Sequence, residues 1–401
     1  MTTPSLRMTV PDPIEASALA STPLTTPFDF EPRTNLVFGC GAVKRLAELI
    51  AALGVDRPLL VADQGLVDAG HVAQVESLLT NAGIEAVRFH DFDVNPDTTM
   101  LAAGCAVARP GNINGIIGLG GGSSMDCAKG INLLLTNGGR LEDYRGYGKA
   151  THPLLPMVGV PTTAGTGSEA QSYAVIADAS THMKMACGDP QIAFRVSILD
   201  PELTISQPAS VTATAGFDAL AHAVETAVTK RRTALSDCFA REAWRLLNAS
   251  YPVVLDHPGD VNGRAAMQLG AFYAGLAIEQ SMLGAAHACA NPLTARYQLT
   301  HGVALAILLP HVVRWNGVVA APLYGRLLGD PQEQEDPSKR LATRLRELAD
   351  HAGLPCQLRT EGVELDALPQ LAHEAEQQWT GTFNPRPLTT VDALEIYKCA
   401  F

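Results

Sequence analysis

The chain has 401 residues, of which 47% are hydrophobic and only 17% are charged, and its formal net charge is −12. This length predicts two domains, and an acidic chain without a Lys/Arg-rich block argues against nucleic acid or anionic membrane as a partner. Its eight cysteines form no C-x-x-C pair, so we expect reduced thiols in a soluble, cytoplasmic protein.

The first part of the chain alternates between strand-like and helix-like stretches. Residues 1–29, rich in Pro, Ser and Thr, are expected to form a loosely ordered arm without a signal peptide. Strands are then predicted over residues 35–39, 57–63, 85–92, 115–120, 156–163 and 195–200, and helices over 42–54, 70–83 and 97–110. Such alternation predicts βαβ units and a parallel sheet.

The second part of the chain has a different pattern. Residues 209–350 contain long Ala/Leu-rich stretches at helical spacing, such as "RAAMQLGAFYAGLAIEQ". We therefore predict an α/β domain with a parallel sheet over residues 30–205 and an all-helical domain over residues 206–401.

A run of three glycines gives the first chemical signal. Gly120, Gly121 and Gly122 follow an apolar strand and precede a predicted helix. Glycines let backbone N–H groups approach a pyrophosphate, and the helix N-terminus favours its negative charge. Ser123 would cap the helix or donate to a phosphate oxygen. A simple tight turn explains the glycines equally well, since Ser123 stands where the G-x-G-x-x-G fingerprint needs its last glycine.

Two further features lie at predicted strand ends. The polar stretch "PTTAGTGSE" (161–169) follows another apolar strand, so both loops are expected at one crevice along the carboxyl edge of the sheet. Asp63 ends the strand over 57–63, where an acid can accept hydrogen bonds from a ribose 2′-hydroxyl and repel a 2′-phosphate. A turn or helix-cap role for Asp63 is at least as compatible with its position.

Four residues of the predicted helical domain suggest a metal site. Asp218 and His222 lie four apart on a helix and therefore share one face. Such pairs are more often surface contacts, but this helix is otherwise apolar, and an unpartnered buried carboxylate is costly. His287 and His301 would add two nitrogen ligands from later helices, and a set of three nitrogens and one oxygen suits Fe²⁺ or Zn²⁺.

These pieces, in this order, resemble the iron-containing (group III) alcohol dehydrogenase family over about residues 28–401. The resemblance rests on "NLVFGCGAVKRL", "LLVAD", "VNPD", "GLGGGSSMDCAK", "PTTAGTGSEA", "ILDPELT", "GFDALAHAVE", the segment with His287 and His301, "LLPHVVRWN" and "NPRPLT". It implies a dinucleotide-binding domain, a helical metal-binding domain and a cleft between them.

The resemblance also assigns expected roles to residues. The metal ligands would be Asp218, His222, His287 and His301, and the pyrophosphate would rest on Gly120, Gly121, Gly122 and Ser123. Thr162, Thr163 and Ser168 would line the nicotinamide side, and Asn95 and Lys184 would contact adenosine or ribose. Asp63 favours NAD over NADP, and Asp126 is expected to hold the loop or lie near the nicotinamide rather than act as a base.

Asn291 departs from the family pattern. Many members have a second histidine four residues after the third ligand, where it is thought to help relay a proton, but this chain reads His287-Ala-Cys-Ala-Asn291. An amide can orient substrate or water but does not titrate near neutral pH. The departure affects the expected proton route and not the expected metal site.

The resemblance implies a metal-dependent, NAD-linked alcohol dehydrogenase that transfers hydride reversibly between an alcohol and NAD, giving an aldehyde or ketone. One alternative is an NAD- and metal-using lyase of the dehydroquinate synthase-like type, although the helical half shows little clustering of basic groups near its ligands, which a phosphorylated substrate needs. Another is a non-catalytic metal-binding scaffold subunit. The low charge fraction favours a homodimer or larger homo-oligomer. The particular alcohol and the choice between iron and zinc stay open at this stage.

Overall fold

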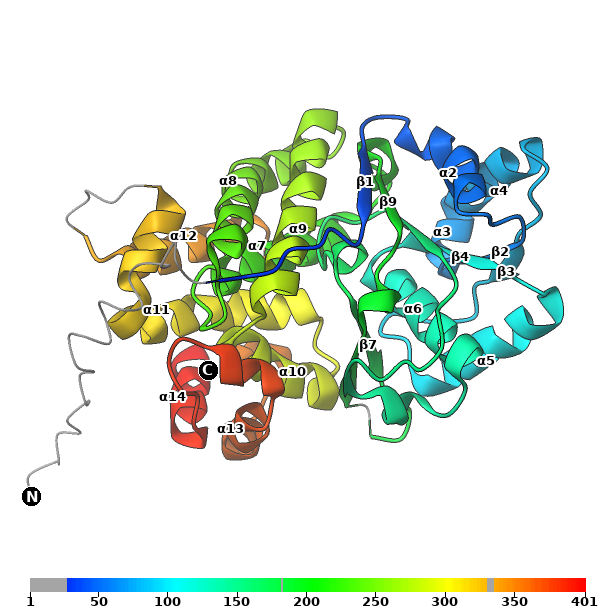
Figure 1. Ribbon diagram of the computed structural model, residues 1–401. Coiled ribbons are helices and arrows are strands. Elements are labelled where there is room, and N and C mark those ends of the chain that lie inside the picture. The colour runs from blue at the N-terminus through cyan, green and yellow to red at the C-terminus, as the bar shows by residue number, and fades with distance from the viewer. Residues whose placement is uncertain (1–26, 182, 330–334) are drawn as a thin grey trace, which may run out of the picture.

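The computed structural model describes residues 27–181, 183–329 and 335–401, and it places an α/β half beside a helical half (Figure 1). The expected N-terminal arm over residues 1–29 lies outside the described residues except for positions 27–29, which have no regular secondary structure.

A six-stranded parallel sheet forms the centre of the α/β half. Its strand order is β1-β9-β6-β4-β2-β3. The strands are β1 (Asn35–Phe38), β2 (Pro58–Val61), β3 (Val87–Phe89), β4 (Gly115–Gly120), β6 (Met157–Pro161) and β9 (Val196–Leu199). The four inner strands are buried at every residue, as in parallel sheets that are covered on both faces. The predicted parallel sheet is confirmed.

Helices cover both faces of this sheet. They are α2 (Leu46–Ala52), α3 (Gln64–Asp68), α4 (His71–Asn81), α5 (Thr98–Ala108) and α6 (Gly122–Asn137). Successive side chains of a strand point to opposite faces. Leu59 therefore packs in one core with residues of α5 and α6, while Leu60 packs in the other with residues of α2 and α4. The helix that follows the three glycines is thus fixed on one face of the sheet.

A small second sheet was not among the predicted elements. It has the order β5-β8-β7, with β5 (Gly146–Tyr147), β7 (Tyr173–Ala177) and β8 (Lys184–Gly188), and β7 pairs antiparallel to β8. Its strands are short and only partly buried, so they lack the continuous apolar runs that predict inner strands. This sheet carries Lys184 and Tyr173 to the side of the α/β half that faces the helices.

The described residues after Ala209 form helices and no strand, which confirms the predicted helical half. The helices are α7 (Ala209–Thr226), α8 (Ala234–Asp256), α9 (Val261–Ser281), α10 (Ala285–Tyr297), α11 (His301–Leu328), α12 (Pro337–His351), α13 (Leu368–Glu376) and α14 (Thr390–Ala400). Helix α7 packs against α8, α9 and α11. Its residues 216–226 are all buried, so this apolar helix holds its few polar side chains inside the protein.

Helix α11 is the longest and one of the most apolar helices among the described residues. Among the described residues it is the one helix that is long and apolar enough to cross a membrane, and 72% of its most apolar window is buried inside the molecule. It packs against α7, α10 and α12 and so acts as a core helix.

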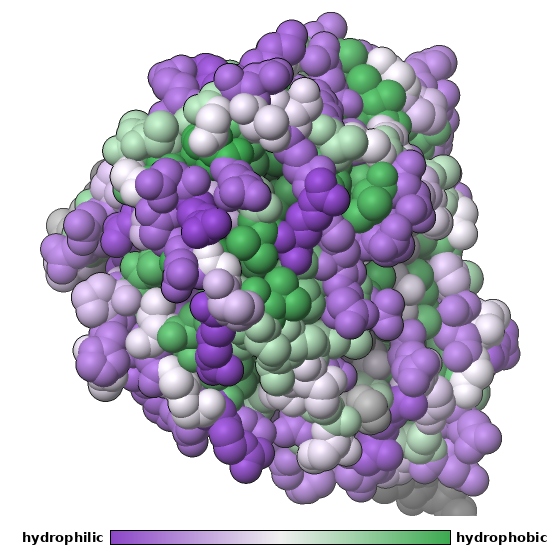
Figure 2. All heavy atoms as spheres, turned by 90° about the vertical axis from the view of Figure 1, so that its right-hand side faces the viewer, coloured by the Kyte–Doolittle hydropathy of each residue, from purple (hydrophilic) through white to green (hydrophobic). Residues whose placement is uncertain are grey.

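Figure 2 shows that the face of the molecule on the α/β side is largely hydrophilic, with hydrophobic residues in smaller patches.

Candidate active site between the two halves

Four side chains from three helices converge in the helical half. Asp218 and His222 project from one face of α7, His287 comes from α10, and His301 is the first residue of α11. The Asp218 Oδ1 atom lies 3.2 Å from the Nε2 atom of His222, 3.6 Å from that of His287 and 4.0 Å from that of His301. The structure therefore brings together all four residues that the sequence suggested as ligands.

The arrangement fits a divalent metal ion. Ligands about 2.0–2.2 Å from a tetrahedral ion lie about 3.3–3.6 Å from one another, close to the spacing of these atoms. Within the described residues, Asp218 Oδ1 and His287 Nε2 are buried atoms without a hydrogen-bond partner. Burying such atoms is costly unless a ligand satisfies them. Asp218, His222 and His287 alone already form a group that could hold an ion.

A second carboxylate orients His287. The Nδ1–H of His287 donates to Glu225 Oε2, and the backbone N–H of Ala286 donates to Glu225 Oε1 at 2.6 Å. This hydrogen bond places the imidazole lone pair on Nε2, the atom that faces Asp218. Burial lowers the pKa of His287, but the carboxylates of Glu225 and Asp218 outweigh burial and raise it to about 9. Glu225 thus increases the basicity of this nitrogen.

The other site histidines favour their neutral forms. Burial lowers the pKa of His222 to about 4, although Asp218 opposes the shift. Burial also lowers the pKa of His301 well below its usual value, and the Lys184 ammonium adds to the effect. Burial would raise the pKa of Asp218, but His222 and then the other histidines hold it below its usual value. Neutral imidazoles around a carboxylate are the forms that bind a metal ion.

The glycine turn lies against the second polar loop. Gly120 has φ +138°, and a Cβ atom there would lie 2.3 Å from Ser124 Oγ. A Cβ atom on Gly122 would lie 2.6 Å from Thr166 Cγ2. The backbone N–H of Thr162 donates to the Gly120 carbonyl at 3.0 Å. The two loops therefore meet at the carboxyl edge of β4 and β6, and glycine is needed because side chains would fill the contact.

Ser123 and Asn95 also meet at this edge. The Ser123 hydroxyl accepts a hydrogen bond from the backbone N–H of Asn95 at 3.2 Å. Asn95 adopts the left-handed conformation, with φ 60°. The N-cap of α6 is Gly121, which makes no side-chain cap bond, so Ser123 does not cap the helix. The capping alternative for Ser123 is wrong, while its role toward a phosphate stays a prediction.

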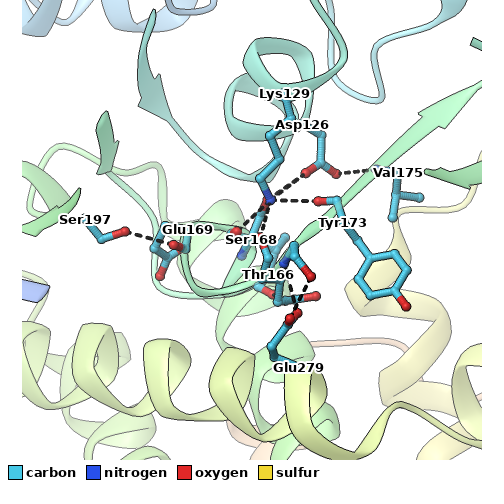
Figure 3. A network of polar contacts seen from close by, with 11 residues as sticks. Asp126, Lys129, Thr166, Ser168, Glu169, Tyr173, Val175, Ser197 and Glu279 are labelled. Atoms are coloured by element: carbon cyan, nitrogen blue, oxygen red, sulfur yellow. Dashed lines mark hydrogen bonds and ion pairs between the residues drawn. The ribbon is translucent and has the colours of Figure 1, made fainter. Parts of the chain in front are cut away.

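Asp126 holds the loop between β6 and β7 (Figure 3). Its Oδ1 accepts from the Ser168 hydroxyl at 2.6 Å, and its Oδ2 accepts from the backbone N–H of Val175 at 3.1 Å. Burial raises the pKa of Asp126, and Lys129 is the largest of the groups that oppose this shift. Both carboxylate oxygens of Asp126 accept hydrogen bonds from this part of the chain. Asp126 therefore holds the loop and has no oxygen left without a partner, as a base would need.

Asp63 caps the short helix α3. Its Oδ1 accepts from the backbone N–H of Leu66 at 3.2 Å, and its Oδ2 accepts from the Ser124 hydroxyl at 3.4 Å. The helix-cap alternative for Asp63 is therefore what the structure contains. The same bond to Ser124 places the carboxylate beside the start of α6.

Lys184 lies between the cofactor side and the candidate metal centre. In β8, Lys184 pairs with Ala177 of β7. Ala177 also forms an isolated bridge with Asp97, which lies two residues after Asn95. Burial lowers the pKa of Lys184, and the carboxylates of Asp218 and Asp126 both oppose that shift. Asp218 belongs to the helical half and Asp126 to the α/β half. Lys184 therefore lies at the contact between the two halves, which we call the seam.

Asn291 is one helical turn beyond His287 on α10. Its Nδ2 donates to the Gln378 side-chain oxygen at 3.1 Å. Gln378 precedes Trp379, which stacks on Tyr173 of the α/β half with ring centroids 5.8 Å apart. The side-chain amide of Asn291 is thus held by the side-chain amide of Gln378, next to the seam between the two halves.

Three residues near the site were not among those picked out from the sequence: Glu225, Lys129 and Gln378. Glu225 follows His222 by three positions on the same apolar helix, and this spacing could have identified it. Lys129 interrupts the apolar helix α6 and is fully buried. Gln378 had no signal in the sequence, since only the folded chain brings it to Asn291.

The loop between β6 and β7 also contacts the helical half. A Cβ atom on Gly165 would lie 2.7 Å from the Cβ of Ala215, in the turn of α7 before Asp218. A Cβ atom on Gly275 of α9 would lie 2.5 Å from the Gly167 carbonyl oxygen. This one loop therefore joins the candidate cofactor edge to α7, which carries Asp218 and His222, and to the neighbouring helix α9.

Known proteins match this chain along nearly its whole length. The model of "Iron-containing alcohol dehydrogenase" matches residues 32–201, and that of "Fe-containing alcohol dehydrogenase family, C-terminal" matches residues 212–401. The NAD-dependent methanol dehydrogenase of Bacillus methanolicus is 33% identical over 91% of this chain and 97% of its own. The 1,3-propanediol dehydrogenase of Klebsiella pneumoniae is 35% identical over 93% of this chain and 99% of its own.

Solved structures agree with these sequence matches. A crystal structure of 1,3-propanediol oxidoreductase has a TM-score of 0.89 and 34% identity, and covers 94% of this chain and 100% of its own. The alcohol dehydrogenase from Oenococcus oeni has a TM-score of 0.90 and 28% identity over the same shares of the two chains. The comparisons do not favour the lyase or scaffold alternatives. The chain belongs to the iron-containing alcohol dehydrogenase family and is an NAD-linked, metal-dependent oxidoreductase that acts on alcohols.

Proposed function

We propose that Asp218, His222, His287 and His301 together hold one divalent ion, Fe²⁺ or Zn²⁺, at which a small alcohol is oxidised. The observation that carries this proposal is the convergence of three imidazole Nε2 atoms on Asp218 Oδ1 at 3.2–4.0 Å. A bound ion supplies a Lewis acid that makes an alcohol hydroxyl more acidic, and bound NAD supplies the hydride acceptor.

The chain's own residues position the reactants in this proposal. The pyrophosphate of NAD rests on Gly120, Gly121, Gly122 and Ser123, and Thr162, Thr163 and Ser168 line the nicotinamide side. Asn95 and Lys184 contact the adenosine or ribose, and Asp126 holds the loop that carries Ser168. The contact between the two loops and the seam position of Lys184 support this placement.

Asp63 selects NAD over NADP in this proposal. It lies beside the start of α6, where a carboxylate repels a 2′-phosphate and accepts from a 2′-hydroxyl. Asn291 orients the substrate or a water molecule. One N–H of its Nδ2 donates to Gln378, so its carbonyl oxygen can still accept a hydrogen bond and its second N–H can still donate one. The proton then leaves through water or ribose hydroxyls.

We propose small primary alcohols and diols as the substrate class. The relatives of similar length are named for methanol and 1,3-propanediol, and two further relatives, both Escherichia coli proteins at 32% identity, are named lactaldehyde reductase.

We also propose an α/β domain over residues 30–205, a helical domain over 206–401, and a cytoplasmic homodimer or larger homo-oligomer. All eight cysteines are unpaired thiols, which supports a reducing compartment.

A panel of alcohols tests the proposal. Purified protein reconstituted with Fe²⁺ or Zn²⁺ should form NADH with one or more of methanol, ethanol, 1,2-propanediol and 1,3-propanediol, with about one ion per chain by elemental analysis. Chelation should abolish NADH formation, and adding the ion back should restore it. Full turnover by metal-free protein would contradict the proposal, as would an absence of NADH with every alcohol despite bound metal.

A further inference from the structure

The helix that carries His287 cannot cap its own start. The N-cap residue of α10 is Gly284, which has no side chain to bond the first backbone N–H groups. Pro292 lies inside the same helix and lacks the N–H that would bond the Ala288 carbonyl, so one internal hydrogen bond is missing. The part of α10 between Gly284 and Pro292, which contains His287, therefore depends on contacts from outside the helix.

Two side chains from other parts of the chain supply the acceptors at this helix start. The backbone N–H of Ala285 donates to Asn384 Oδ1 at 3.2 Å. The backbone N–H of Ala286 donates to Glu225 Oε1 at 2.6 Å. A Cβ atom on Gly284 would lie 2.9 Å from Asn384 Oδ1 and 3.0 Å from Glu225 Oε1. An amide and a carboxylate thus occupy the space that the side chain of an N-cap residue would fill.

A second buried amide holds Asn384 in place. Asn384 Nδ2 donates to Asn316 Oδ1 at 2.9 Å, and Asn316 Nδ2 donates to Asn384 Oδ1 at 3.0 Å. Asn384 Nδ2 also donates to the Arg386 carbonyl at 2.8 Å. Asn384 is 1% exposed and Asn316 is 2% exposed. With the bond from Ala285, both donors and both acceptor positions of the Asn384 amide are filled, so its orientation is fixed.

Arg386 anchors the same segment to α11. Its Nη1 donates to the Trp315 carbonyl at 2.9 Å, and its guanidinium lies over the Trp315 ring, 4.2 Å from the centroid. Trp315 is followed on α11 by Asn316, and this helix also carries a candidate metal ligand. Asn384 therefore joins α10 to α11 through Asn316, while Glu225 joins α10 to α7. Contacts to all three ligand-bearing helices meet at the start of α10.

We infer that Asn384 is a positioning residue for the metal ion: its amide fixes the first turn of α10 and so the direction in which His287 presents Nε2 toward Asp218. The Cα–Cβ direction of a helical residue follows its backbone, so a shift of this turn would move the imidazole with it. Asn384 is not a ligand and acts through the backbone of Ala285. The inference rests on the proposed metal site.

The test compares buried asparagines in the two halves of the protein. Asn384→Ala removes the acceptor for the Ala285 N–H, and Asn316→Ala removes the amide that orients Asn384. Asn132→Ala is the matched control, because Asn132 is equally buried but bonds to the backbone of Leu155 in the α/β half. Competition with a chromogenic chelator measures the dissociation constant for Zn²⁺, at a temperature where the variants are folded by circular dichroism. The visible absorption spectrum of the Co²⁺-loaded proteins reports the geometry of the ligands.

We expect all three variants to lower the thermal midpoint, because each leaves buried polar groups without a partner. Asn384→Ala should also raise the Zn²⁺ dissociation constant by about tenfold or more and alter the Co²⁺ spectrum, since the partners behind metal ligands typically contribute about 10–100-fold in affinity. Asn316→Ala should act in the same direction with a smaller effect. Asn132→Ala should keep the wild-type dissociation constant and spectrum.

A Zn²⁺ dissociation constant within about threefold of wild type, with an unchanged Co²⁺ spectrum, would overturn the inference if found in Asn384→Ala, because the amide would then only stabilise the fold. If Asn384→Ala does not fold, wild-type affinity and spectrum in Asn316→Ala would overturn it instead. An equal loss of affinity in Asn132→Ala would also overturn it, since the effect would then follow stability and not position. If wild type itself binds neither Zn²⁺ nor Co²⁺, the proposed metal site fails.

Discussion

The candidate metal centre and the Lys129 cluster, made of Lys129, Asp126 and Ser168, are both buried groups of polar side chains, but they differ in how their atoms are satisfied. In the metal centre, Asp218 Oδ1 and His287 Nε2 are buried and make no hydrogen bond within the described residues. In the Lys129 cluster, the ammonium, the Ser168 hydroxyl and both Asp126 oxygens have partners inside the protein.

This difference separates two kinds of buried polar group. Unsatisfied atoms that point toward one another require something from outside the chain, and three nitrogens with one oxygen require a metal ion. Satisfied atoms need no ligand and instead fix the backbone that surrounds them.

The largest effect is expected from removing a metal ligand. His287→Ala deletes one of the four converging donors, so bound metal should be lost and kcat/KM for the best alcohol should fall on the order of 10³-fold. Elemental analysis and NADH formation measure both quantities. His351→Ala, which removes an exposed histidine bonded to Asp256, is the control and should leave both unchanged. Retention of metal and full turnover by His287→Ala would rule out this metal centre.

A smaller effect is expected from the carboxylate behind that ligand. Glu225→Gln weakens the acceptor for His287 Nδ1–H, so the affinity for Zn²⁺ should fall about 10–100-fold while the fold is kept. Competition with a chromogenic chelator measures this affinity. Glu242→Gln on the surface of α8 is the matched control. An unchanged Zn²⁺ affinity in Glu225→Gln would mean that the carboxylate does not act on the ligand.

The nucleotide preference should depend on Asp63. Asp63→Ser keeps a side-chain oxygen that can cap α3 but removes the charge that repels a 2′-phosphate. The ratio of kcat/KM for NADP to that for NAD should rise about tenfold, which corresponds to about 1.4 kcal/mol. Asp68→Ser, five residues further along, serves as the control. The Asp63 assignment would be wrong if the ratio stayed at its wild-type value.

Glu169 is a buried neighbour of Lys129 whose protonation should affect the stability of the protein. Burial raises the pKa of Glu169 to about 7, so folding favours its protonated form. The stabilisation from this group is present below about pH 4.5 and is lost as the pH rises through 7. Glu169→Gln should therefore be more stable than wild type at pH 8 by about 1–3 kcal/mol, but not at pH 5. Urea unfolding at both pH values measures this, and an equal difference at both would contradict it.

Part of the fold and of the candidate metal site could be predicted directly from the sequence. The alternating apolar stretches predicted the parallel sheet, because buried strands and amphipathic helices have distinct periods. Asp218 and His222 could be paired because they share one face of a single helix. His287 and His301 were added as two further nitrogen donors on later predicted helices, and the family resemblance then supported them, since no local pattern spans the 65 residues from His222 to His287.

Other parts depend on tertiary contacts that leave little trace in the sequence. The small sheet was missed because its short strands are only partly buried. Lys129 has one local ion-pair partner, Asp126, but its hydrogen-bond acceptors lie about 40 residues further along the chain, in a segment whose polar atoms are mostly backbone. Backbone acceptors are the same for every sequence, so only the folded chain reveals them.

The contact between Gly167 and Gly275 has a mechanical consequence. These residues join the two halves through main-chain atoms, with no side chain between them to change rotamer or compress. The loop backbone and α9 therefore approach more closely here than any side chain would allow. A side chain at either position would push the loop between β6 and β7 away from α9. The spacing between the two halves at this point is thus set by two absent side chains.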